Sequence, residues 1–256
     1  MTAARARAVL SSLLLLVGCA SRDAPPMGER PDRFVSLGEV DSTIELDIRY
    51  YTFNNFVGRP IRGYHSPKCL LTREAAGALA KAQRVARATG YSLKVYDCYR
   101  PQRAVTDFAE WARDIRDTKM QHRFYPAVPK RELFALGYIA EKSGHSRGST
   151  TDVTLVPVGT YQPQQIPGAT RYDCRLPVSQ RYPDNSIDMG TGYDCTDVKA
   201  NTASPLITPE QRKWRTTLVA AMRKQGFVNY FREWWHFSLP GAGGEAYDFP
   251  ILSHRP

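Results

Sequence analysis

The chain has 256 residues, 42% of them hydrophobic and 11% aromatic, and its 35 basic and 25 acidic side chains give a formal net charge of +10. This length is enough for one domain with a substantial core, and the apolar content excludes a disordered chain. The basic residues are scattered, with no run longer than Pro129-Lys130-Arg131, which favours a solvated surface over a nucleic-acid site. We therefore expect no nucleic-acid partner.

The N-terminal segment is typical of an export signal. Arg5 and Arg7 precede the apolar stretch from Ala8 to Gly18, which is short for a membrane span. The stretch ends in Leu16-Val17-Gly18-Cys19, which resembles the lipobox of bacterial lipoproteins, although an ordinary cleaved signal would leave the cysteine incidental. We expect an exported lipoprotein on the periplasmic or cell-envelope side, anchored to a membrane by a lipid on Cys19. The expected organisation is a signal peptide over 1–18, a polar, proline-rich tether over 19–33 and a single domain over 34–256.

Strand patterns recur along this domain. Ile44, Leu46 and Ile48 alternate with polar residues, which predicts a strand over 43–49 with these three side chains on one face. Further β-rich runs predict strands over 91–97, 153–156, 227–231 and 234–239.

Three helices are marked by their starts. Thr72 is expected to cap an alanine-rich helix that Gly90 ends, and Pro101 to open a second helix. Thr208 begins a third with proline next and glutamine at the third helical position, and Gly226 ends it. Helices and strands are interspersed with few βαβ units. The expected class is therefore α+β, with a small antiparallel sheet flanked by helices.

The stretch from 157 to 205 is rich in Pro, Gly, Asp and Gln, and loops of this length are usually functional lids or disulfide-linked excursions. Apart from Cys19 the chain has four cysteines, an even number that suits an oxidising compartment. Four cysteines allow three pairings, and the sequence does not choose among them. We favour Cys69 with Cys98 and Cys174 with Cys195, because the latter bond would close this loop. A thiolate metal site lacks the usual Cys-x-x-Cys pair.

Two histidines stand in unusual company. His145 lies in Ser143-Gly144-His145-Ser146-Arg147-Gly148, and Asp152 follows seven residues after the histidine, where a strand is expected. His236 closes the motif Glu233-Trp234-Trp235-His236. Two imidazoles and one carboxylate form a catalytic zinc set that leaves the fourth position for water, and a carboxylate such as Glu233 takes the water proton.

Each motif alone has an ordinary interpretation. A histidine in an aromatic strand is more often a core residue, and the turn after His145 could be a plain aspartate-stabilised loop. In a regular strand, Glu233 and His236 would also point to opposite faces, so the metal hypothesis needs a bulge or a strand that begins after Glu233. Such a set of two histidines and an aspartate could also hold manganese or iron.

The combination resembles the D-alanyl-D-alanine dipeptidases, zinc peptidases known from vancomycin resistance, over roughly residues 36 to 250. The pattern Ser-x-His-x-x-Gly-x-x-x-Asp followed by Glu-x-x-His carries the resemblance. Further segments match in the same order: Asn55 to Tyr64, Tyr96-Asp97-Cys98-Tyr99-Arg100-Pro101, and Asp188 to Asp194. The resemblance implies a fold shared with D-Ala-D-Ala metallopeptidases and the hedgehog signalling domain.

The resemblance also implies a role for each site residue. His145, Asp152 and His236 would hold one Zn²⁺, Glu233 would be the general base and acid, and Arg100 would stabilise the oxyanion. Asp194 would bind the ammonium group of a small D-amino-acid dipeptide, and Ser143 and Tyr64 would line the substrate site.

Alternatives remain at this level. A D,D-carboxypeptidase that trims peptidoglycan stem peptides would use the same chemistry. A non-catalytic cell-wall binding module would keep the zinc site without turnover, although it would need neither Glu233 nor Arg100. The export signal favours scavenging or wall turnover over a cytoplasmic resistance role.

Overall fold

The computed structural model describes residues 28–254, so the expected signal peptide and Cys19 lie outside the described residues. Its main sheet has five strands in the order β2-β4-β5-β7-β6. β2 runs parallel to β4, whereas the other neighbours are antiparallel. A smaller antiparallel sheet pairs β1 with β3. The strands are β1 (Phe34–Ser36), β2 (Glu45–Leu46), β3 (Leu70–Thr72), β4 (Tyr91–Asp97), β5 (Thr150–Pro157), β6 (Val228–Asn229) and β7 (His236–Ser238).

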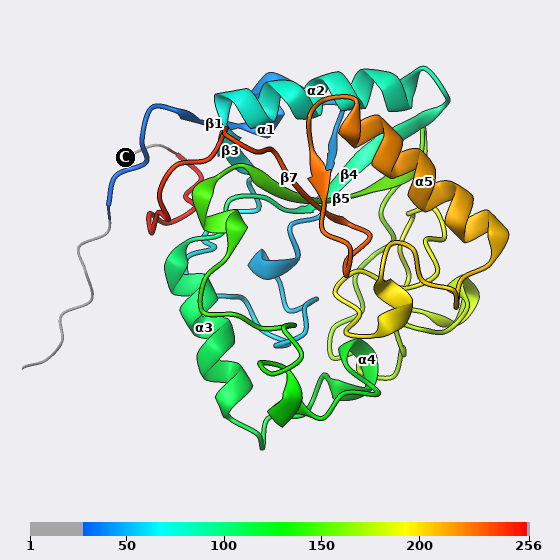
Figure 1. Cartoon of the computed structure of the whole chain (residues 1–256). Coiled ribbons are helices and arrows are strands. Elements are labelled where there is room, and N and C mark those ends of the chain that lie inside the picture. The colour runs from blue at the N-terminus through cyan, green and yellow to red at the C-terminus, as the bar shows by residue number, and fades with distance from the viewer. Residues whose placement is uncertain (1–27, 255–256) are drawn as a thin grey trace, which may run out of the picture.

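Helices flank the main sheet. Figure 1 shows α2 and α5 along one side of it, with α3, α4 and most of the irregular segments on the other. Thr72 caps α2, and Thr208 and Gln211 form a capping box on α5, as the sequence predicts. In the described residues no helix is long and apolar enough to cross a membrane. The α-helices are α1 (Leu37–Val40), α2 (Arg73–Arg87), α3 (Gln102–Arg113), α4 (Gln121–Phe124) and α5 (Pro209–Arg223).

The strand expected over 43–49 is wrong in extent, because only β2 forms. Ile44 and Ile48 are buried, but Leu46 is 36% exposed on the edge strand. The chain then leaves the sheet where the buried Asp47 pairs with Arg49 at 2.7 Å, the first residue of a 3-10 turn. We expected an antiparallel sheet, but β2 runs parallel to β4, so the main sheet is mixed.

The two final strands are also shorter than expected, because residues 230–235 form the turn between β6 and β7. The stretch from 158 to 205 has no strand and only two 3-10 turns, Val178–Gln180 and Val198–Ala200. Both expected disulfides are present, joining Cys69 to Cys98 and Cys174 to Cys195. The second bond closes part of the irregular stretch, as predicted.

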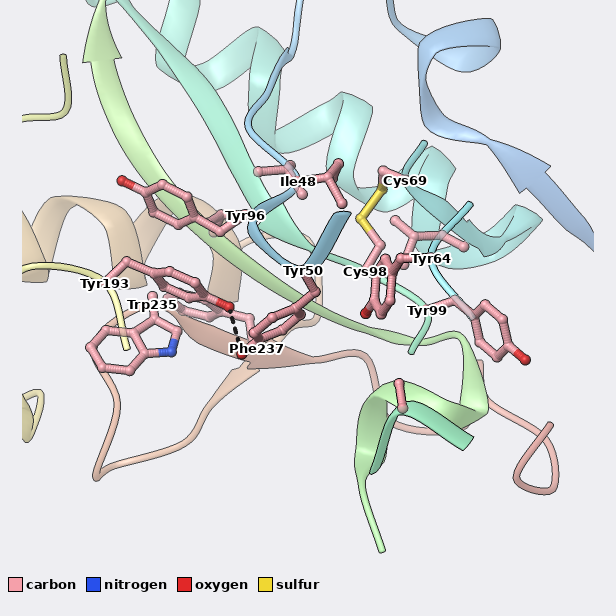
Figure 2. Close-up of a cluster of buried hydrophobic side chains, with 14 of the residues drawn as sticks. Ile48, Tyr50, Tyr64, Cys69, Tyr96, Cys98, Tyr99, Tyr193, Trp235 and Phe237 are labelled. Atoms are coloured by element: carbon pink, nitrogen blue, oxygen red, sulfur yellow. Dashed lines mark hydrogen bonds between the residues drawn. A yellow bond between two sulfur atoms is a disulfide. The ribbon is translucent and has the colours of Figure 1, made fainter. Parts of the chain in front are cut away.

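A layer of aromatic side chains packs between the main sheet and the irregular stretch after β5 (Figure 2). Tyr96 of β4 stacks on Tyr193, with ring centroids 4.4 Å apart, and Trp235 packs edge-on against Tyr193 at 5.5 Å. Tyr50 lies beside them with its hydroxyl 3.3 Å from that of Tyr193. This layer anchors the irregular stretch to the sheet, next to the residues described below.

Candidate active site

The pairing of three adjacent strands aligns the acidic and imidazole side chains of the site. Asp152 of β5 is opposite Asp97 of β4 on one side and His236 of β7 on the other. Directly paired residues of neighbouring strands project to the same face of a sheet. Sheet register therefore brings Asp97, Asp152 and His236 into one row.

A bulge in β4 contributes to this row. Val95 pairs with Val153, yet Asp97 pairs with Asp152, so two residues of β4 oppose one of β5. The extra residue shifts Asp97 into register with Asp152, and such bulges re-aim side chains beside active sites.

His145 comes from a short turn that folds over the end of β5. The 3-10 turn Gly144–Arg147 begins at Ser143, whose hydroxyl accepts a hydrogen bond from the His145 N–H at 3.2 Å. It ends at Gly148, whose φ of +74° suits glycine, and a Cβ there would lie 2.2 Å from the Phe34 ring. The imidazole Nδ1 lies 2.6 Å from the Cys98 carbonyl oxygen, to which it donates. Its Nε2 is therefore a lone-pair donor that faces the sheet row.

The donor set fits a metal ion. His145 Nε2 lies 3.3 Å from both Asp152 Oδ1 and His236 Nδ1, and His236 Nδ1 lies 3.1 Å from Asp152 Oδ1. All three donors lie within 4.8 Å of one another. Asp152 Oδ1 is buried without a hydrogen-bond donor in the described protein, which is costly unless a cation binds there. Two imidazoles and one carboxylate match the ligand set of a catalytic zinc site.

Glu233 approaches the trio because β7 begins only at His236. Glu233 lies in the turn between β6 and β7, where the His236 N–H donates to its carbonyl at 3.2 Å. Asn229 fixes this turn by donating to the carbonyls of Glu233 and His236. The carboxylate Oε2 reaches 3.5 Å from His236 Nδ1. The strand entry that the metal hypothesis required is therefore present.

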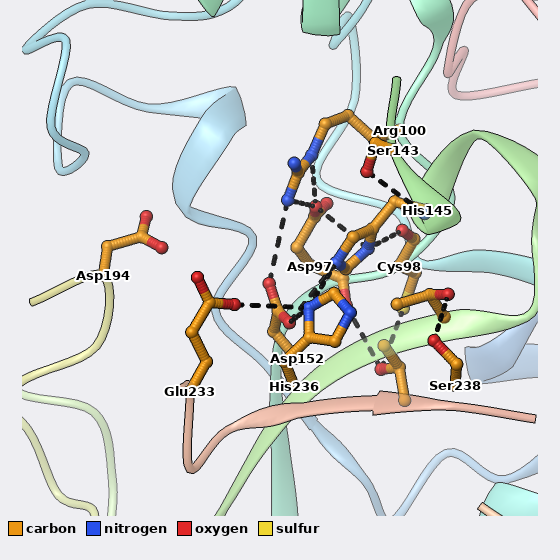
Figure 3. A network of polar contacts seen from close by, with 12 residues as sticks. Asp97, Cys98, Arg100, Ser143, His145, Asp152, Asp194, Glu233, His236 and Ser238 are labelled. Carbon is orange, nitrogen blue, oxygen red and sulfur yellow. Dashed lines mark hydrogen bonds and ion pairs between the residues drawn. The ribbon is translucent and has the colours of Figure 1, made fainter. Parts of the chain in front are cut away.

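Arg100 is held beside the trio by a buried carboxylate. Its guanidinium pairs with Asp97 at 2.8 Å and lies 3.8 Å from Asp152 Oδ2, as Figure 3 shows. It also faces the rings of Tyr50 and Phe108, at 5.0 and 5.2 Å from their centroids. These contacts fix the orientation of the Arg100 guanidinium and leave little of it exposed to solvent.

Asp194 lies across the cleft, beyond Glu233 in Figure 3. Its carboxylate accepts a 2.9 Å hydrogen bond from the Tyr50 hydroxyl. Burial raises the pKa of Asp194 well above its ordinary value, and the nearby Asp152 raises it further. No basic side chain forms an ion pair with Asp194 in the described protein, so its carboxylate would gain from a bound cation.

The cleft encloses about 260 Å³. Its lining includes the trio, Glu233, Arg100, Asp194 and Ser143. Tyr64 is not part of the lining: it is buried, and its hydroxyl donates to Asp97 at 2.6 Å, behind Arg100. Sequence reasoning thus grouped these residues correctly in space, with Tyr64 placed one layer further from the cleft.

Comparison with known proteins agrees with this geometry. The model of the D-ala-D-ala dipeptidase family, peptidase family M15, matches residues 30–168 and 169–255. The chain is 32% identical over 220 residues to a D-alanyl-D-alanine dipeptidase of Enterococcus faecium, covering 85% of this chain and 98% of that protein. It is 34% identical to one of Streptomyces coelicolor with the same coverage, and 28% identical to one of Escherichia coli over 86% of this chain and 90% of that protein. The chain belongs to the D-ala-D-ala dipeptidase family. It is a metallopeptidase.

Three residues of this family member escaped the assignment of roles from the sequence. Asp97 holds Arg100 and also lies 3.4 Å from His145 Nδ1. Tyr193 donates to Asp152 Oδ2 at 2.9 Å, and Tyr50 donates to Asp194. Asp97 lies inside the Tyr-Asp-Cys-Tyr-Arg-Pro motif, and Tyr193 directly precedes Asp194, so proximity to motif residues was the available signal.

The charges of the cleft are balanced around Asp152. Burial alone would raise the pKa of Asp152, but His145 and His236 outweigh it and hold the pKa well below the ordinary value. Burial instead raises the pKa of Glu233, with His236 opposing the rise. Asp152 is therefore poised as an anionic ligand, while Glu233 is a stronger base than a solvated glutamate.

Proposed function

We propose that this metallopeptidase hydrolyses the dipeptide D-Ala-D-Ala to two D-alanines and that zinc is its metal. The observation that carries the proposal is the partly buried Asp194 carboxylate, which faces the same small cleft as Arg100 and the metal trio. A free dipeptide is a zwitterion, so its ammonium group needs such a carboxylate. The cleft volume of about 260 Å³ is below the range of about 300–1,000 Å³ that drug-sized ligands occupy.

His145, Asp152 and His236 would hold the ion. A bound zinc would lower the pKa of a water molecule in its open position toward 7 and polarise the scissile carbonyl. Glu233 would accept the proton from the attacking water and return it to the amine of the departing D-alanine. Its turn position beside His236 and its raised pKa suit both transfers.

Arg100 would stabilise the negative charge that develops on the carbonyl oxygen. Its guanidinium is preorganised by Asp97 and needs no rearrangement when that charge appears. Loss of one such donor typically lowers the rate about 10²- to 10³-fold.

The test is D-alanine release from D-Ala-D-Ala by the purified domain without residues 1–19, with and without a chelator. We expect turnover that the chelator abolishes and zinc restores. Glu233→Ala should lower kcat by at least about 10²-fold while metal content, measured by mass spectrometry, stays at the wild-type level. Glu210→Ala, on the exposed face of α5, serves as the matched control and should leave turnover unchanged.

An amine-blocked peptide that ends in D-Ala-D-Ala separates this proposal from its alternatives. Turnover of the blocked peptide in preference to the free dipeptide would replace the dipeptidase assignment by that of a wall-trimming carboxypeptidase. Zinc binding with no turnover of either substrate would leave a non-catalytic wall-binding module.

We also propose that the protein is an exported lipoprotein held to a membrane through Cys19. The lipobox-like sequence and the two disulfides of the folded domain support an oxidising compartment outside the cytoplasm. Radiolabelled palmitate should enter the wild-type chain and the protein should sediment with membranes. Cys19→Ala should lose both properties, and labelling that persists in this variant would refute the anchor.

A further inference from the structure

A second, smaller cavity is lined in part by Tyr193 and contains none of the metal trio in its wall. It encloses about 40 Å³, and its wall combines core residues with the irregular stretch after β5. Tyr193 belongs to this wall while its hydroxyl contacts the trio through Asp152. Three arginines line the cavity, Arg49, Arg123 and Arg181, together with one carboxylate residue, Asp184.

Arg123 is a buried cation with no carboxylate partner among residues 28–254. It is 3% exposed, and its guanidinium donates to the Ala169 carbonyl at 3.0 Å and to the Asn54 side chain. The Tyr182 ring lies 3.6 Å from its central carbon. These neutral contacts orient the guanidinium without neutralising it, and burial followed by the nearby Arg49 lowers the pKa of Arg123 to about 9.

Arg181 adds an unsatisfied donor to the same wall. The residue is 8% exposed, and its Nη2 pairs with Asp188 at 2.6 Å. Its Nη1 is buried and has no hydrogen-bond partner in the described protein. A buried guanidinium donor without an acceptor is rare because its desolvation is then uncompensated.

The charges around the cavity leave one cation in excess. Arg49 pairs with Asp47 and Asp184, and Asp184 also binds the buried Lys94. Asp188 pairs with Arg181. The count is therefore three carboxylates (Asp47, Asp184 and Asp188) and four cations (Arg49, Lys94, Arg123 and Arg181). Arg123 and Arg181 both border this cavity, so a single anion in it would offset the excess charge.

We propose that this cavity is a binding site for a small oxyanion, separate from the dipeptide cleft. Guanidinium groups present paired N–H donors that match the oxygens of sulfate, phosphate or a carboxylate. One water molecule needs about 10–15 Å³ of such space, so a cavity of about 40 Å³ has room for an anion of a few heavy atoms.

The experiment is a calorimetric titration of the zinc-loaded domain with sulfate, at ionic strength held constant with chloride. We expect one saturable site. Arg181→Gln, which removes the free donor and keeps a polar side chain, should weaken sulfate binding at least about tenfold. Arg116→Gln is the matched control, since its side chain is 92% exposed, and should bind as the wild type does. Phosphate and acetate titrations then tell whether the site takes a tetrahedral or a planar oxyanion.

Two results would overturn the proposal. One is the absence of saturable binding by all three anions. The other is binding that Arg181→Gln leaves intact but His236→Ala abolishes, because the anion would then sit at the metal trio. Thermal unfolding of each variant shows that it is folded. Since sulfate binding is read independently of D-alanine release, failure of the proposed dipeptidase activity would leave this test valid.

Discussion

The metal trio and the irregular stretch from 158 to 205 are both parts of the site, but they are built differently. Asp152 and His236 are set by backbone pairing between β5 and β7. Asp194, in contrast, belongs to a segment without strands, which is positioned by side chains. One half of the site therefore depends on local sheet register, whereas the other half depends on long-range polar contacts.

The contacts of the irregular stretch are numerous and buried. Asp184 joins it to the sheet by binding Lys94 of β4 at 2.5 Å and Arg49 at 2.6 Å. Arg215 of α5 donates to three backbone carbonyls of this stretch, those of Met189, Lys199 and Asn201. The Cys174–Cys195 bond closes it covalently. Removing one of these contacts should therefore disturb the stretch more than the trio.

The largest expected effect comes from Asp184→Asn. The substitution leaves Lys94 buried without a carboxylate, and breaking a buried ion pair from one side costs about 3–5 kcal/mol. Denaturant unfolding should show this loss, and Asp114→Asn, an exposed control, should change stability by less than about 0.5 kcal/mol. The metal affinity of the folded variant should stay near the wild-type value. A large loss of metal affinity would show that the trio also depends on the side-chain contacts of the irregular stretch.

At acidic pH, the difference in free energy of unfolding between the wild type and Asp184→Asn should become smaller. Burial alone would raise the pKa of Asp184, but Lys94 and Arg49 outweigh burial and hold it well below its ordinary value. A carboxylate with a lowered folded-state pKa stabilises the protein above its unfolded pKa of about 3.9 and loses that contribution as pH falls toward the folded value. The wild-type advantage should thus be full at neutral pH and shrink below about pH 4.

Tyr193→Phe tests whether the two regions are coupled, because Tyr193 belongs to the irregular stretch yet donates to the proposed metal ligand Asp152. The ring would still stack on Tyr96, so stability should change little. Loss of a hydrogen bond to a metal ligand typically lowers metal affinity about 10- to 100-fold. Competition with a zinc chelator measures this, with Tyr161→Phe as the control at an 88% exposed site. Unchanged affinity would show that the two regions act independently.

The sequence predicted the parts of the site that depend on local pattern. The His145 turn, the helix caps at Thr72 and Thr208, and both disulfides are present where expected. For Glu233 and His236 to reach the same site, the strand had to begin after Glu233. β7 begins at His236, so this condition is met.

The rest depended on contacts between distant residues. Lys94 and Asp184 are 90 positions apart, and nothing near either residue indicates that a lysine in the middle of a strand is fully buried. The bulge that brings Asp97 into the row is likewise invisible in an apolar pattern. The edge position of β2 explains why alternation over 43–49 gave only two paired residues.

The smallest expected effect concerns the backbone at Asp194, which has a φ of +57°. Left-handed conformations cost a residue other than glycine about 1 kcal/mol, and asparagine adopts them more readily than most. Asp194→Asn also removes a partly buried carboxylate that has no cation partner in the described protein. The variant should therefore unfold at a temperature a few degrees higher than the wild type. A lower unfolding temperature would contradict this assignment of strain.

Asp194 thus limits how much thermal stability this protein can gain at this position without losing its proposed activity. The same substitution that relieves the backbone strain and removes the unpaired carboxylate would also remove the proposed partner of the substrate ammonium group. Selection for heat resistance alone would favour asparagine or glycine at this position, whereas selection for turnover would keep aspartate. Position 194 is therefore where a stability screen and an activity screen of this protein should choose different residues.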